Sequence, residues 1–171
     1  MKKQVNFLVP FVQLLVICGL LFIFGNLMQT MPKQISGNGN LGVVSILALV
    51  ILFPFSVYVC VRLLIQLRIR PRGLSLLGVG AVLDLCFGYL YQLQSYSNYK
   101  EFVKEQVISS GRTSDEMYID SITSGFSSYM NSQFFNVNTF IMFGSSVLVA
   151  SVLIVWISRR IVCTEVNEEG F

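Results

Sequence analysis

Histidine is absent from this sequence of 171 residues, and its four cysteines stand far apart. Without histidine the chain lacks the commonest metal ligand and the usual general base near neutral pH. Neither a CxxC pair nor any metal-ligand spacing joins Cys18, Cys60, Cys86 and Cys163. We therefore predict no metal, no cofactor, no structural disulfide and no enzymatic activity.

Charged side chains are also scarce, at 12% of the residues, while hydrophobic side chains make up 54%. Soluble domains carry about 25% charged residues. The net charge of +3 is small, and the basic residues form no large surface with aromatic platforms, which nucleic-acid binding would need. The composition therefore excludes nucleic acid as a partner and favours a membrane protein.

The hydrophobic residues lie in four long blocks, at 5–28, 41–67, 74–93 and 135–157. A helix rises about 1.5 Å per residue, so about 20 residues cross the roughly 30 Å hydrocarbon layer of a membrane. We predict an all-α integral membrane protein in which residues 1–171 form a single domain, a bundle of four transmembrane helices. The first block exceeds the roughly 7–15 apolar residues of a signal peptide, so we expect it to be retained.

Basic residues near the ends of the spans predict how the chain crosses the membrane. Loops rich in lysine and arginine stay on the cytoplasmic side. One arrangement puts the larger basic set there: Lys2, Lys3, Arg62, Arg68, Arg70, Arg72, Arg159 and Arg160. Both termini are then cytoplasmic, with a tail at 158–171, and the loop at 94–134 is extracytoplasmic. The arginines of the turn also suit anionic lipid headgroups. The chain has no Asn-x-Ser/Thr sequon, which favours a bacterial inner membrane.

Asp84 is the only acidic residue within the four blocks, about ten residues into the third. An aspartate at that depth costs about 2.5–3.5 kcal/mol on insertion scales, and such residues face the protein interior or a wet cavity. Gly80 and Gly88 lie one turn on either side, so another helix can pack closely against the carboxylate. Arg62, inside the end of the second block, is the predicted ionic partner, provided that the second and third spans pair antiparallel.

Three interpretations of Asp84 stay open. In the first, it is a polar clasp that holds the bundle together. In the second, it is a protonatable site in a transport path or channel, and in the third it contacts another membrane protein. Replacement by asparagine separates these interpretations, because loss of expression supports the clasp, whereas intact folding with lost activity supports a functional site.

Small residues mark a second predicted packing face, on the fourth block. Ser146 and Ala150 are four residues apart, which is the spacing of close helix contacts in membranes. We favour packing within the chain's own bundle over a contact between two copies, although a homo-oligomer remains the alternative.

The loop at 94–134 is predicted to be partly helical. The third helix is expected to continue through 97–109 and to end at Gly111. Thr113 and Glu116 have the spacing of a capping box at the start of a further helix. Apolar residues then recur near helical spacing and form a candidate outer docking face: Met117, Ile122, Phe126, Tyr129 and Met130. This face could cover the bundle or the membrane surface, or it could bind a partner.

These features leave three classes of function. We favour a non-enzymatic interaction protein, which would be an accessory or regulatory subunit or an immunity protein against a membrane-active toxin. The alternative is a small transporter or channel subunit that uses Asp84. A membrane enzyme comes last. Four-span quinone-linked oxidoreductases that generate disulfides need cysteine pairs on the oxidising side, and here every cysteine falls within a span or on the predicted inner side.

In length and predicted topology the chain is similar to the four-span immunity proteins against pore-forming colicins. The likeness is one of architecture and involves no shared motif. It implies a toxin in the bilayer as the partner. The other expected partners are membrane lipid, another membrane protein and a second copy of the chain.

Overall fold

The computed structural model describes residues 6–31, 39–111 and 115–168. Within these ranges the chain forms helices joined by turns. Four of the helices are long and apolar enough to cross a membrane: α1 (Leu8–Leu27), α2 (Gly42–Gln66), α3 (Pro71–Ser109) and α6 (Val137–Glu168), the last over Val137–Ile161. The structure thus confirms an all-helical chain with four potential spans, which fits an integral membrane protein.

Helix α3 is much longer than a membrane crossing requires. Pro71 occupies its first helical position, where the missing N–H costs little, and Arg70 before it is extended. Its 39 residues span about 58 Å, roughly twice the thickness of the hydrocarbon layer. The helix runs on through 97–109, the segment expected to extend it, and Gly111 follows with a φ of +69°.

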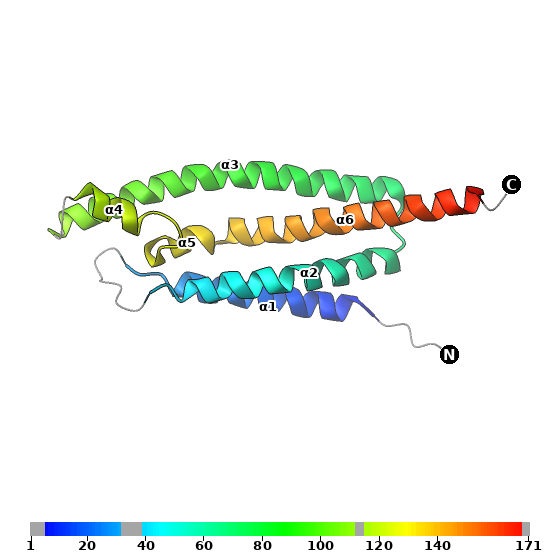
Figure 1. Ribbon diagram of the computed structural model, residues 1–171, viewed down its shortest axis with the longest axis horizontal. Helices are drawn as coiled ribbons and strands as arrows, with labels where there is room; N and C mark the ends of the chain where they lie inside the picture. The colour runs from blue at the N-terminus through cyan, green and yellow to red at the C-terminus, as the bar shows by residue number, and fades with distance from the viewer. Residues whose placement is uncertain (1–5, 32–38, 112–114, 169–171) are drawn as a thin grey trace.

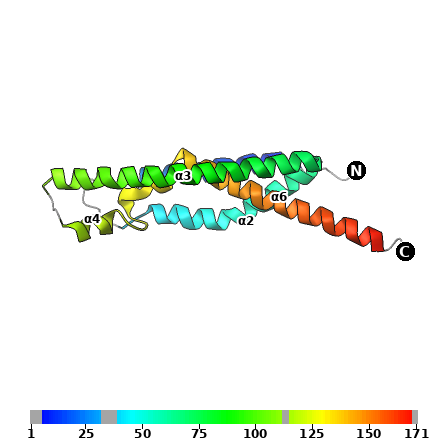
Figure 2. The same cartoon turned by 90° about the horizontal axis from the view of Figure 1, so that it is seen from above.

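The four long helices pack in the order α1, α2, α6, α3 (Figure 1), and the view from above shows α6 running obliquely to α3 (Figure 2). Helix α2 packs against α1 and α6, and α6 packs against α3. Helix α6 therefore lies between α2 and α3, which follow each other in the sequence but are not main packing partners (Figure 1). The antiparallel pairing of the second and third spans, on which the prediction for Arg62 depended, is not what the structure shows.

The molecule has two different ends (Figure 1). The start of α1, the turn between α2 and α3 and the end of α6 lie at one of them, which we name the terminal end. Three short helices lie at the other, the loop end: α4 (Glu116–Ile122), the 3-10 helix η1 (Ser128–Met130) and α5 (Asn131–Phe134).

At the loop end, α4 packs along the part of α3 that extends beyond the apolar stretch. Val103 and Val107 of α3 form a buried apolar cluster with Ile119 of α4. Two ion pairs link the same helices: Lys100 Nζ to Asp120 Oδ1 at 3.0 Å, and Lys104 Nζ to Glu116 Oε1 at 3.8 Å. The extension of α3 is therefore covered on one side, because α4 supplies the apolar contacts that an isolated helix lacks.

Helix α4 begins at a side-chain cap. The carboxylate of Asp115 accepts a hydrogen bond from the backbone N–H of Met117, with a donor–acceptor distance of 3.0 Å. This satisfies one of the free donors of the first turn. Thr113, which the capping-box pattern proposed for this role, lies outside the described residues.

Two buried apolar clusters form the core of the four long helices. One joins α2, α3 and α6, and consists of Val57, Cys60, Leu64, Leu74, Val147, Val152 and Val155. The other joins α1, α2 and the short segment between α5 and α6. It consists of Cys18, Phe22, Leu49 and Phe135. The two buried thiols act here as small apolar groups.

Candidate functional site

Asp84 lies in the middle of the apolar stretch of α3. Its side chain is half-buried and contacts α6. Its Oδ2 accepts a hydrogen bond of 2.7 Å from the hydroxyl of Ser145 on α6. This bond is of the kind that the clasp interpretation requires, because it joins α3 to α6 within their apolar stretches.

Arg62 does not contact Asp84. Its guanidinium carbon lies 5.2 Å from the ring centroid of Phe7, at the terminal end. The ion pairs between α3 and α4 involve neither Arg62 nor Asp84, and the predicted pair between these two residues does not form. The physical reason is the position of α6, which separates the two helices.

The two glycines beside Asp84 have different surroundings. Gly88 is buried, and a Cβ added to it would lie 2.8 Å from Cγ of Met142 on α6. Gly80 is exposed, and a Cβ added there would meet no atom within 4 Å. Gly78, which the sequence pattern missed, also faces α6, with Val152 Cγ1 3.2 Å from an added Cβ. Gly78 and Gly88 thus permit close packing on α6, whereas Gly80 faces outward.

Ser146 and Ala150 on α6 are both half-buried. The hydroxyl of Ser146 donates to the carbonyl oxygen of Met142 in its own helix, at 2.9 Å, and Ala150 packs beside the core cluster of α2, α3 and α6. The fully buried small residue is Ser151. Its hydroxyl lies 2.7 Å from the carbonyl oxygen of Val147 and 3.3 Å from that of Val57 on α2.

The five residues of the candidate outer docking face do not share a face. Met117 and Phe126 are exposed, by 80% and 61%, while Ile122 packs beside the cluster of α3 and α4. Tyr129 and Met130 are buried inside the loop end. The prediction of one continuous apolar face is wrong, because the chain leaves the helix after Ile122 and re-enters helical structure only at Ser128.

A network of amide side chains, which sequence analysis missed, ties α3 to α5 and α6 at the loop end. Nε2 of Gln92 donates to the backbone oxygen of Gln133 at 2.6 Å. Nδ2 of Asn138 donates to the backbone oxygen of Gly88 at 3.0 Å and to Oε1 of Gln92 at 3.1 Å. Each amide carries donors and acceptors, so the network satisfies backbone groups as well as side chains. The signal in the sequence is the recurrence of Gln and Asn where the third and fourth spans reach the loop.

A second amide pair joins α1, α2 and α5. Asn131 is fully buried, and its Nδ2 donates to the backbone oxygen of Met28 at 3.0 Å. Asn131 also pairs with Asn40 through side-chain atoms 2.8 Å apart, and Asn40 donates to the backbone oxygen of Phe126 at 2.7 Å. The two networks together fix the short helices of the loop end on the ends of the long ones.

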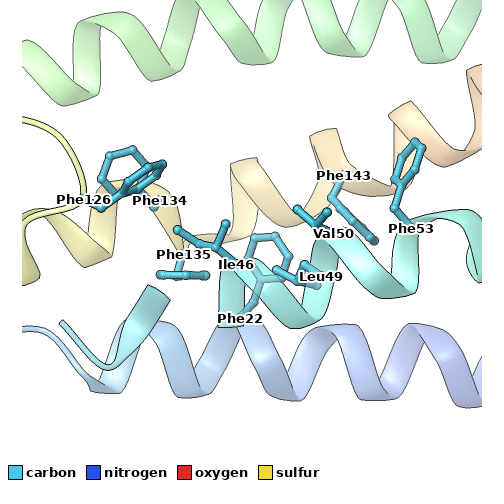
Figure 3. A pocket seen from close by; sticks show the side chains of 9 residues that line it. All are labelled: Phe22, Ile46, Leu49, Val50, Phe53, Phe126, Phe134, Phe135 and Phe143. Atoms are coloured by element: carbon cyan, nitrogen blue, oxygen red, sulfur yellow. The ribbon is translucent and has the colours of Figure 1, made fainter. Parts of the chain in front are cut away.

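Phenylalanine rings line a groove of about 450 Å³ between α2, Phe22 of α1 and the chain that leads from Phe126 through α5 into α6 (Figure 3). We name it the α2 groove. Its lining is entirely apolar and includes Phe22, Phe53, Phe134, Phe135 and Phe143. Apolar groups are therefore its natural contents.

A second groove, of about 520 Å³, lies between α1 and α6, and we name it the α1 groove. Phe22 and Phe135 line both grooves. The ring centroid of Phe22 lies 5.8 Å from that of Phe135 and 5.3 Å from that of Phe140, each pair edge to face. These rings form the wall between the two grooves.

The described residues contain no group of three or more Cys, Asp or Glu side chains that could hold a metal ion. Comparisons of the chain with protein-family models, with curated proteins and with solved structures gave no match.

Proposed function

We propose that this chain acts in the bilayer by binding another membrane protein without catalysis, as an accessory or regulatory subunit or as an immunity protein against a membrane-active toxin. The observation that carries the proposal is the side of α3 next to Asp84. There a half-buried carboxylate lies one turn from Gly80, whose surroundings are open. We name the surface made by Gly80, Asp84 and Phe87 the α3 face.

The α3 face has the chemistry of a helix-contact surface. Asp84 receives one hydrogen bond, from Ser145, and makes no other within the described residues. A carboxylate has two oxygens that can accept several bonds, and leaving it partly exposed to hydrocarbon is costly. A partner helix can approach closely at Gly80 because it meets no side chain there. Such a helix would shelter Asp84 and supply the missing donors.

The membrane orientation is part of the same proposal. We infer that the terminal end is cytoplasmic and the loop end extracytoplasmic, in a bacterial inner membrane. The basic turn between α2 and α3, with Arg68 and Arg70, lies at the terminal end and supports this orientation. The same arginines suit anionic lipid headgroups.

The transporter or channel alternative receives less support. A transport path needs a cavity that reaches the titrating group, and Asp84 lines neither the α1 groove nor the α2 groove. Proton flux through liposomes that contain the purified chain, abolished by Asp84→Asn, would reverse this preference.

Photocrosslinking in living cells tests the proposal. Phe87 is exposed and lies seven residues from Gly80, on the same side of α3, whereas Tyr89 is exposed on the opposite side at a similar depth. A photoreactive residue at 87 should capture one membrane protein, and the same residue at 89 should capture only lipid. Gly80→Leu should lower the yield at 87 at least fivefold, because the leucine blocks close approach. Asp84→Asn should lower it less, because an amide still accepts a hydrogen bond.

The outcomes are separable. Circular dichroism and detergent gel filtration show whether each variant folds as the parent chain does. Lipid adducts alone at position 87, in cells where the chain is folded, would overturn the proposal. An adduct between two copies of the chain would replace the proposed partner by a homo-oligomer.

A further inference from the structure

We propose that the α1 groove holds an acyl chain of a diacyl lipid, with the lipid's glycerol ester beside Asn26. The lipid belongs to the leaflet at the loop end. This site does not depend on the α3 face, which lies on the far side of α6. Two properties of the groove carry the inference, namely its depth and the placement of its polar groups.

The depth of the groove matches one leaflet. Its lining runs along α1 from Gly19 to Leu27 and meets α6 at Val137 and Phe140. Eight residues of helix correspond to about 12 Å, and half of the hydrocarbon layer is about 15 Å. Because Leu27 and Val137 stand at the loop-end limits of α1 and α6, the groove extends from the membrane boundary almost to the midplane.

Polar groups are confined to one end of the groove. Asn26 and Asn136 lie at its loop end, and apolar side chains and Gly19 line the rest. A lipid has the same polarity, because its ester groups lie at the membrane boundary and its chains point inward. Nδ2 of Asn26 donates to the backbone oxygen of Phe135 at 2.7 Å. An amide nitrogen has two N–H donors, so the second is available for an ester carbonyl oxygen.

The α1 groove differs from the α2 groove in its lining. Its volume is about 520 Å³. The α2 groove has a similar volume but an entirely apolar lining, and so lacks a group that could bind the ester. The amphipathic site is the α1 groove.

Labelling with a photoactivatable lipid tests the site on the full purified chain. The chain is reconstituted into vesicles of phosphatidylethanolamine and phosphatidylglycerol that contain a small fraction of phosphatidylethanolamine with a diazirine on one acyl chain. After irradiation, adducts are mapped by mass spectrometry. We expect adducts at Ile23 and Phe140 to exceed those at the exposed Leu76 on α3, and Gly19→Leu to lower the excess at least fivefold, because the leucine fills the groove.

Two glycine variants serve as controls. Gly80→Leu adds the same side chain where no atom lies within 4 Å, and it should leave labelling of the α1 groove unchanged. Gly19→Ala places a Cβ 3.9 Å from Phe140, an ordinary contact, so this variant should fold and lower the labelling partly even if the leucine variant does not fold.

A lipid with an ether in place of the ester tests the role of Asn26. The ether lacks the carbonyl acceptor, so it should label the groove of the parent chain less than the ester lipid does, and Asn26→Ala should remove that difference. Labelling that is no higher at Ile23 and Phe140 than at Leu76, or that Gly19 variants leave unchanged, would overturn the inference. Adducts between two copies of the chain at these positions would do the same.

Discussion

Helix α6 is packed by different kinds of residue on its two sides. Toward α3, small residues predominate: Gly78 and Gly88 let the helices approach, and Ser145 donates a hydrogen bond to Asp84. Toward α1 and α2, phenylalanine rings separate the helices in the half next to the loop end, and a groove lies on each side of the Phe22 ring. On the α3 side the helices are in direct contact. On the side of α1 and α2, aromatic rings keep the helices apart and leave two grooves.

This difference shows what holds helices together in hydrocarbon. Lipid chains are as apolar as leucine, so burial of apolar surface does not drive helices together within the bilayer. Close approach and interhelical hydrogen bonds remain, and the α3–α6 contact uses both. On the other side the edge-to-face rings give favourable contacts at a distance, and the space that they leave becomes available to a ligand. Substitutions on each side of α6 test this difference.

Phe22→Ala should have the largest effect. The ring is the wall between the two grooves, so its removal joins them and leaves Phe135 and Phe140 without their partner. Large-to-small changes of a buried phenylalanine cost about 3–5 kcal/mol. We expect the free energy of unfolding to fall by about 3 kcal/mol, the lower end of this range, because acyl chains can enter the space.

The measurement is the free energy of unfolding in detergent micelles, followed by circular dichroism during titration with sodium dodecyl sulfate. Leu20→Ala is the matched control, because Leu20 is exposed on the same helix and should change stability little. Equal losses of unfolding free energy for the two variants would show that the Phe22 ring does not support the packing between the two grooves.

Gly25→Ala should have the next largest effect. A Cβ at Gly25 would lie 2.6 Å from two carbons of the buried Phe135 ring, one of them Cγ at the base of the ring, so the whole side chain must shift. Overpacking of this kind costs about 1–3 kcal/mol, and we expect about 2. Gly88→Ala is the comparison on the other side of α6. There the Cβ meets the unbranched side chain of Met142, which can adopt another rotamer. Oδ1 of Asn138, at 3.2 Å, has to move only by a few tenths of an ångström, so the loss should be about 1 kcal/mol or less.

The same unfolding titration compares the two alanine variants. We expect Gly25→Ala to lower the free energy of unfolding more than Gly88→Ala does. If Gly88→Ala costs more, the contact between α3 and α6 is the less adaptable side, and the aromatic side is the softer one.

The four spans could be predicted from the sequence because their signal is local. A block such as 41–67 is too long and too apolar for any other structure, and Gly111 lies just beyond the end of the extended third helix. The partners of the spans could not be predicted in this way. Consecutive elements are adjacent only about two-thirds of the time. Here the fourth span lies between the second and third, so Arg62 and Asp84 remain apart.

The loop end was misjudged for a related reason. Helical spacing from Met117 to Met130 assumes one unbroken helix, but Gly125 has a φ of +56° and the chain turns there. The Ser124-Gly125 pair is a turn signal, and it outweighed the apolar periodicity. Tyr129 and Met130 are buried for that reason. The amide networks were missed because Gln and Asn near span ends suit the membrane interface equally well, and only tertiary contacts show which of them pair.

The hydrogen bond between Asp84 and Ser145 should have the smallest effect, and a double-mutant cycle isolates it. Interhelical hydrogen bonds in membranes contribute about 0.6–1.7 kcal/mol, so Asp84→Leu and Ser145→Ala should show a coupling of about 1 kcal/mol in unfolding free energy. Ser146→Ala is the matched control, because that hydroxyl donates to the carbonyl oxygen of Met142 in its own helix and should show no coupling to Asp84→Leu. A coupling near zero for Ser145 would mean that small residues alone close the contact between α3 and α6. The carboxylate would then be retained for the proposed partner and not for the fold.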